Sequence, residues 1–238
     1  MKCPRHAGRF SEDLHDPFGS FLAEGSGHLD ISRLRDYIRD RHQAEGSYRG
    51  ESFAPEQLRR TPHAVQYRDW EARAVVFCEG WIASTNPFFQ EIPWKAAKGE
   101  VLTVRLDSPL PSPLSEMILN CGKWLLPLGE GLYRTGATYG WDNLNGKPTP
   151  QGRRAILDAL AAFLQRTVTV VEHNAGVRPI TRDYRPVLGA HPRHPEIIIF
   201  NGMGSKGVLC GPWCAELLAQ HLLQSKPLPP EVEVARYF

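Results

Sequence analysis

The chain has 238 residues, of which 42% are apolar and 23% are charged, and its formal net charge is +2. This composition is that of a folded globular protein, and it excludes a largely disordered chain. The small net charge argues against nucleic acid or an anionic membrane as the main partner.

The N-terminal part begins with polar residues that show no periodic pattern. Residues 1–17 are therefore expected to be irregular, and because they contain no apolar signal-peptide core we expect a cytoplasmic protein. No apolar run approaches the ~18 residues of a membrane-spanning helix. Residues 18–23 and residues 47–53 are candidate short strands. Between them, Asp30 is a suitable cap for a helix that ends near Gly46, with an apolar stripe made of Ile31, Leu34, Tyr37 and Ile38.

The middle of the chain is typical of strands. Residues 72–80 (ARAVVFCEG) form a continuous apolar run ending in glycine, which favours a strand covered on both faces. From residue 98 to residue 138, short apolar runs alternate with Gly and Pro, which predicts an antiparallel sheet with one wet face. Its candidate strands are residues 101–106, 117–120, 123–128 and 131–138.

Helices and strands alternate in the last third. Thr149-Pro150 opens a predicted helix, since proline suits the first helical position. Residues 168–171 and 197–200 are candidate strands, residues 208–223 form a long apolar helix, and the proline-rich tail at 227–238 is expected to be irregular. The buried face of the first helix is predicted to contain Ile156, Leu157, Leu160, Phe163 and Leu164.

The five cysteines are an odd number without the spacing of a disulfide framework. Cys210 and Cys214 lie four residues apart, so both could face the same side of a helix, with His221 two turns further on. A metal site there would need a second pair of ligands, and none is evident. We interpret both cysteines as small buried helix residues and predict no metal site.

A glycine-rich stretch follows the apolar strand EIIIF and precedes the last helix. It reads Asn201-Gly-Met-Gly-Ser-Lys-Gly207, the pattern G-x-G-x-x-G. Glycines let the backbone approach a ligand, and the helix start favours negative charge. Three interpretations remain open: a self-contained dinucleotide site, a turn without a ligand, or a loop that completes a site built by earlier segments. The first needs a second parallel strand ending in an acidic residue, for which little chain remains, so we favour the third.

Three blocks of sequence, taken in order, resemble the D-amino-acid oxidase and glycine oxidase superfamily of FAD-dependent oxidoreductases. The resemblance extends from about residue 18 to about residue 223, and its bacterial branch leaves the substrate open. The blocks are Val75–Trp81 with Lys98–Leu102, then Gly136-Ala137-Thr138 with Pro148–Gly152, and then Ala175–Pro179 with Thr181, Asp183, Pro186, Gly189 and the glycine loop.

The resemblance implies an α/β (α+β) fold, in which a partial FAD-binding layered α/β domain is interleaved with an antiparallel-sheet substrate domain. Members of this family begin with a strand, a glycine turn and a helix that hold the ADP half of FAD. Nothing of this kind precedes Phe18, so we expect an N-terminally truncated form. The expected division is an irregular start at 1–17, FAD-domain elements with some substrate-domain strand at 18–97, the substrate domain at 98–172, the C-terminal part of the FAD domain at 173–226, and a tail at 227–238.

The same resemblance implies where the cofactor and substrate bind. Arg178 would bind a substrate carboxylate, although it could instead join sheet and loop through Asp183. The aromatic residues Trp81, Tyr139, Trp141 and Trp124 would line a pocket or belong to the core. We expect the FAD-binding residues to converge with Arg178 on one cavity: Gly80, Trp81, Gly202, Met203, Gly204, Ser205, Lys206 and Gly207.

The resemblance therefore implies FAD-dependent oxidation of a small amine or amino acid by hydride transfer to flavin. The alternative is a non-catalytic remnant or binding module that has lost FAD. A Cys/His hydrolase has little support, because no G-x-S-x-G elbow is present. In either case, truncation would expose an apolar face of the FAD domain, which predicts self-association or a partner that covers it.

Overall fold

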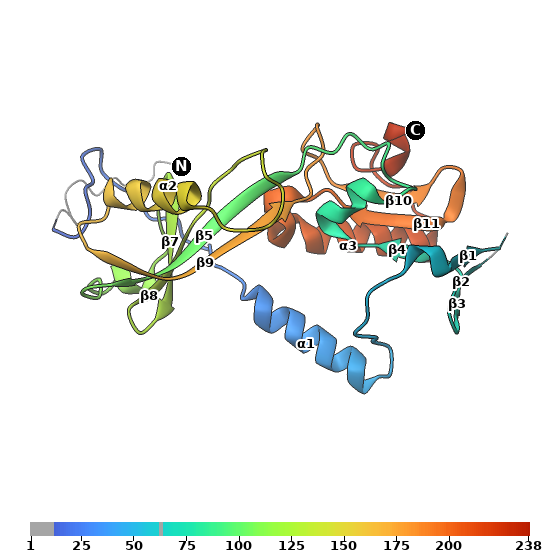
Figure 1. Cartoon of the computed structure of the whole chain (residues 1–238), viewed down its shortest axis with the longest axis horizontal. Coiled ribbons are helices and arrows are strands. Elements are labelled where there is room, and N and C mark those ends of the chain that lie inside the picture. The colour runs from blue at the N-terminus through green and yellow to red at the C-terminus, as the bar shows by residue number, and fades with distance from the viewer. Residues whose placement is uncertain (1–11, 62–63) are drawn as a thin grey trace. The chain divides into compact units, whose positions relative to one another are not determined.

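A computed structural model describes residues 12–61 and 64–238 (Figure 1). The expected irregular start therefore lies largely outside the described residues. The chain forms two compact units, each built from two stretches of sequence. Unit 1 contains the chain up to Gly27 together with Ala97–Val177, and unit 2 contains His28–Ala96 together with Arg178–Phe238.

Unit 1 contains a five-stranded sheet in the order β6-β7-β8-β5-β9 (Figure 1). β5 pairs antiparallel with β8, β8 with β7, and β7 with β6. The predicted antiparallel sheet is confirmed, although β9 continues well beyond the expected end at residue 171. The strands are β5 (Ala97–Leu106), β6 (Leu119–Cys121), β7 (Lys123–Gly129), β8 (Leu132–Gly136) and β9 (Val168–Arg178).

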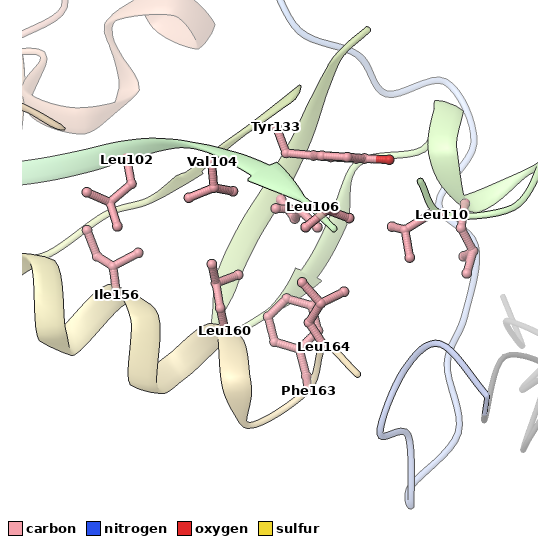
Figure 2. Close-up of a cluster of buried hydrophobic side chains, with 11 residues drawn as sticks. Leu102, Val104, Leu106, Leu110, Tyr133, Ile156, Leu160, Phe163 and Leu164 are labelled. Carbon is pink, nitrogen blue, oxygen red and sulfur yellow. The ribbon is translucent and has the colours of Figure 1, made fainter. Parts of the chain in front are cut away.

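Helix α2 (Pro150–Ala161) covers this sheet and closes the core of unit 1. Ile156 and Leu160 point from the helix toward Leu102 and Val104 of β5 (Figure 2). Burial of each such side chain stabilises the fold by about 1.5–3 kcal/mol. The predicted apolar face is correct for these two residues, and Leu157, the third predicted residue within the helix, is half-buried against the same cluster. Phe163 and Leu164 are also buried, but they follow the helix rather than belonging to it.

A buried carboxylate attaches the start of α2 to β5. Glu100, only 4% exposed, accepts hydrogen bonds from Thr149 N (2.8 Å), Thr149 Oγ1 (2.7 Å) and His173 Nε2 (2.8 Å), and Lys98 Nζ lies 3.6 Å away. Burial raises the pKa of Glu100, but the Thr149 hydrogen bonds, the Lys98 charge and the His173 hydrogen bond outweigh it and lower that pKa overall. The ionised carboxylate therefore supports the helix N-terminus, where negative charge is favoured.

Unit 2 contains a three-stranded sheet in the order β10-β11-β4. β10 (Val187–His191) pairs antiparallel with β11 (His194–Asn201), and β11 pairs parallel with β4 (Val75–Phe77). The sequence predicted β11 and β4 but not β10. Only three residues of the apolar run around β4 form a strand, and Val76 is 40% exposed, so complete cover on both faces was a wrong expectation.

Alternate residues of this sheet enter two different cores, as the pleat of a strand requires. Val187 and Ile199 pack in a cluster with Phe89, whereas Leu188 packs with Cys214 of helix α3 (Gly207–Gln224). Helix α3 runs alongside the sheet (Figure 1). Cys214 is buried, which agrees with its interpretation as a small core residue, whereas Cys210, for which the same was expected, is only half-buried. The tail after α3 has no long helix or strand, but Leu228, Val232 and Val234 are buried.

The remaining parts of unit 2 are a second small sheet, a helix and 3₁₀ turns. The sheet, not predicted from the sequence, has the order β1 (Leu58–Arg60), β2 (Val65–Tyr67), β3 (Trp70–Ala72). Helix α1 (Ile31–Ala44) is confirmed, and the Asp30 carboxylate accepts from Arg33 N at 3.1 Å. The 3₁₀ turns are η1 (Pro55–Gln57), η2 (Gly80–Thr85), η4 (Gly204–Lys206) and η5 (Val234–Tyr237), with η3 (Leu114–Glu116) in unit 1.

Two predicted strands were wrong. Residues 18–23 and 47–53 form no ladder with any described strand, and Phe18 is 88% exposed. A short apolar run becomes a strand only when a neighbouring strand accepts its successive backbone hydrogen bonds. Among the described residues, Ser20 makes a single isolated bridge and residues 47–53 make none. The predicted stripe of α1 is likewise correct in position but not buried.

Among the described residues, no helix has the length and apolar character that crossing a membrane would require.

Replacement of Gly152 by alanine should destabilise the fold. A Cβ at this position would overlap the Glu100 carboxylate, and overpacking of this kind typically costs about 1–3 kcal/mol. Gly211 is the matched control, because it also lies in a helix but has open space at its Cβ position. Because Pro212 disfavours a helical residue with a Cβ directly before it, Gly211→Ala should gain less than the usual benefit of alanine in a helix and leave stability nearly unchanged. Urea unfolding followed by circular dichroism tests both, and equal effects of the two substitutions would contradict the proposed close contact.

Candidate functional site

The turn after β4 contains the first predicted site residues. Gly80 has a φ of +61°, a conformation that glycine adopts without strain, and it begins the 3₁₀ turn η2. Apart from its two chain neighbours, no described residue has an atom within 4 Å of the position where a Cβ of Gly80 would be. Trp81 follows and is half-buried. There is therefore open space on this side of Gly80.

The glycine loop after β11 is shaped by close contacts with its own unit. Gly202 (φ +81°) would place a Cβ 3.0 Å from Val187 N, and Gly204 (φ +55°) would place one 3.0 Å from Ile180 Cγ1. These two glycines are thus required by the packing of the chain itself. Gly207 differs, since its nearest such contact is 3.9 Å, and Ser205 and Lys206 are exposed.

The structure brings the two turns together. β4 and β11 run parallel, with Phe77 opposite Ile199, so both strands end at the same edge of the sheet. There the side chain of Asn201 donates from Nδ2 to the carbonyl oxygen of Gly80 at 2.8 Å. The same side chain accepts from the Gly202 amide at 2.8 Å.

The segment that follows Arg178 also reaches this region through its backbone. Pro179, the next residue, accepts a hydrogen bond from Gly204 N at 3.1 Å, and Ile180 forms a bridge with Met203. Arg178 is half-buried. The alternative partner, Asp183, forms an ion pair with Arg236 at 3.2 Å. Three segments distant in sequence therefore meet: the turn after β4, the chain after β9 and the glycine loop.

The start of α3 gives this region its electrostatic character. The first amides of an α-helix have no acceptor within the helix, and the helix dipole makes that end positive. Within the described residues, the N-cap Lys206 provides no side-chain cap for them. The site can therefore stabilise a group that carries or develops negative charge.

Asn201 is the functional candidate that sequence reasoning missed. It is 4% exposed and ends an otherwise apolar strand. A polar residue at the end of a buried strand, directly before a glycine loop, is the signal that could have identified it. Its carboxamide is satisfied by both turns, as a buried polar group requires.

Other candidates lie elsewhere. A cavity of about 460 Å³ is lined by α1 with Tyr48, and one of about 320 Å³ lies against α2, so neither is lined by the site residues. Tyr139, Trp141 and Trp124 belong to unit 1. His191 is buried among aromatic rings, and its burial, with His194 and Arg193 nearby, lowers the pKa of its imidazole.

Residues 225–238 do not supply the parallel strand that a self-contained dinucleotide site at the glycine loop would need. The segment after α3 contains the turn η5 and a single bridge from Glu233 to Leu188, but no strand follows α3 in the described chain. The loop instead joins segments from earlier in the sequence.

Parts of known proteins are similar to this chain in sequence. The tRNA 5-methylaminomethyl-2-thiouridine biosynthesis bifunctional protein MnmC of Marinobacter nauticus is 33% identical over 153 residues, which cover 58% of this chain and 23% of that protein. Glycine oxidase of Bacillus subtilis is 24% identical over 163 residues, covering 66% of this chain and 42% of that protein. The chain thus spans less than half the length of these relatives.

Solved structures show the same fold. Glycine oxidase from Geobacillus kaustophilus superposes with a TM-score of 0.59 and 23% identity, covering 76% of this chain and 50% of that chain. Iminodiacetate oxidase from Chelativorans gives a TM-score of 0.55 and 22% identity, covering 76% of this chain and 51% of that chain. Likeness at this identity establishes the fold alone. The family model described as FAD dependent oxidoreductase matches residues 5–221, almost the whole chain. This chain therefore belongs to the family of FAD-dependent oxidoreductases.

Proposed function

We propose that this chain takes part in the oxidation of a small amine or amino acid, and that it holds the ring end of FAD and the substrate. The observation that carries the proposal is the meeting of the Gly80 turn, the Arg178-Pro179 segment and the glycine loop in one unit. Convergence of segments far apart in sequence is what a binding site needs. We also propose that the protein acts in the cytoplasm.

The residues present fit the flavin ring. Open space at Gly80 leaves room for a flat group, and the uncapped start of α3 directs backbone amides at it. When bound, FAD would supply the oxidising group that accepts a hydride from the carbon beside the amine. The amides of Ser205 and Gly207 would stabilise the negative charge of the reduced ring, whereas the Lys206 amide donates to Met203 O. The Lys206 side chain adds positive charge nearby.

Arg178 would orient the substrate. A guanidinium is planar and can form two parallel hydrogen bonds with a carboxylate, which fixes the position of the amine and its neighbouring carbon. Two of the similar proteins are named for glycine and for iminodiacetate, and both of these compounds carry an amine beside a carboxymethyl group. The proposed substrate is accordingly a small amine that bears a carboxylate.

Substitution of Arg178 by alanine should chiefly raise the KM for a carboxylate-bearing amine in the flavin-loaded protein. Loss of a charged hydrogen-bonded contact costs about 1.5–3 kcal/mol, which corresponds to a roughly ten- to hundredfold rise. Steady-state kinetics with an amino acid, and with the matching amine that lacks the carboxylate, measure the effect. The exposed Arg182 in the following turn provides a control, and Arg182→Ala should leave the KM unchanged. An unchanged KM in Arg178→Ala for every accepted amino acid would contradict the proposed role.

The 238-residue chain on its own should bind FAD weakly. Among the described residues, β11, the glycine loop and α3 form the one strand–glycine loop–helix unit, and we assign it to the ring rather than to the pyrophosphate. Leu209 and Leu223 of α3 are 82% and 76% exposed, which favours self-association or a covering partner. Gel filtration after addition of FAD, with absorbance read at flavin wavelengths, tests both points. A yellow, monodisperse monomer with FAD near one-to-one would contradict this expectation.

A further inference from the structure

Asn201 directly precedes the glycine loop, and its side chain forms a hydrogen bond with Gly80, where the other turn of the candidate site begins. It is the last residue of β11, and its side chain lies at the edge where β4 and β11 end together. With 4% of its surface exposed, it is almost completely removed from water. A buried carboxamide is retained at low cost only if its donor and acceptor groups both find partners.

The two partners of Asn201 fix the orientation of its carboxamide. A backbone carbonyl can only accept, so Gly80 O must face the Nδ2 donor; a backbone amide can only donate, so Gly202 N must face Oδ1. Only a side chain with one donor and one acceptor at this spacing satisfies both turns. An aspartate would keep the bond from Gly202 but would set a negative oxygen against the carbonyl of Gly80.

The other contacts of the glycine loop come from different directions. Val187 and the Arg185 carbonyl leave no room for a side chain at Gly202. Gly204 donates its amide to Pro179 O and lies close to Ile180. These contacts attach the loop to β10 and to the chain after Arg178. The Asn201 side chain adds the link to the turn at Gly80, and it thereby sets the separation between the two backbones that would flank the ring.

We propose that Asn201 is a positioning residue of the flavin site, which holds the Gly80 turn and the glycine loop at the separation that the isoalloxazine ring requires. This inference rests on the proposed function. Asn201 acts through the two backbones that it joins, and its neutral carboxamide introduces no negative charge beside a ring that becomes negative on reduction.

Asn86 offers a matched control in the same turn. It is also buried, at 8% exposure, and its side chain donates to Glu79 at 2.8 Å and accepts from Phe88 N at 3.0 Å. All of these partners lie within the segment that follows β4. Loss of the Asn86 carboxamide therefore weakens the turn without cutting its link to the glycine loop.

The test compares the 238-residue wild-type chain with Asn201→Ala, Asn201→Asp and Asn86→Ala. Riboflavin, which carries the ring without the pyrophosphate, is titrated and its affinity is measured by fluorescence quenching. Thermal unfolding and amide hydrogen exchange of residues 202–207 are measured without flavin. Because a buried hydrogen bond is lost, both Asn201 variants should bind riboflavin about tenfold more weakly and exchange the loop amides faster. Asn86→Ala should lower the unfolding midpoint and leave the loop amides unchanged, and it should weaken riboflavin binding less than the Asn201 variants do.

The outcomes separate the inference from the function on which it rests. If wild type binds riboflavin and a folded Asn201→Ala binds it equally well, the positioning role is wrong while the proposed function stands. If Asn86→Ala weakens binding as much as Asn201→Ala, the effect is one of general stability and the positioning role is also wrong. If wild type shows no riboflavin binding at all, the proposed function fails and this role fails with it. If Asn201→Asp does not fold, Asn201→Ala alone decides.

Discussion

The parallel pairing of β4 with β11 is the constraint on which the candidate site depends. Parallel strands end at the same edge of a sheet, and in open α/β sheets ligands bind at that edge. The pairing therefore places the Gly80 turn beside the glycine loop, although the two are more than a hundred residues apart in sequence. The Asn201 side chain forms hydrogen bonds with both turns and so fixes their separation. The carbonyl of Pro179 accepts from Gly204 N, which attaches the segment that contains Arg178.

In each unit, a buried polar side chain forms hydrogen bonds that anchor the segment leading into a helix. In unit 1, Glu100 is buried together with the amide and hydroxyl of Thr149 and with His173, and it thereby anchors the N-terminus of α2 on β5. In unit 2, Asn201 is buried between two backbones and anchors the segment that leads into α3. At the start of α2, the Glu100 carboxylate accepts the available hydrogen bonds. At the start of α3, no side chain caps the helix in the described chain. This contrast is why the α3 start is the better place for a ligand.

Much of the fold was predictable from local pattern, and the failures have physical causes. The helix caps Asp30 and Thr149 and the apolar runs of β5, β7 and β11 were correct because they encode their structure locally. The strands expected at 18–23 and 47–53 were wrong because pairing depends on a distant partner. For the site, the glycine pattern and the family resemblance indicated which residues to consider. The bond from Asn201 to Gly80 could not be predicted, since it joins residues that only the folded sheet brings together.

We propose that the turn after β4 and the start of α3 form one site for a flavin ring. Titration of the ¹⁵N-labelled chain with riboflavin, followed by amide chemical shifts, tests this proposal. The amides of Gly80, Trp81 and residues 204–209 should shift together, with one common dissociation constant. Shifts confined to the residues around the cavities at α1 or α2, or no shift in residues 204–209 at saturating riboflavin, would contradict it.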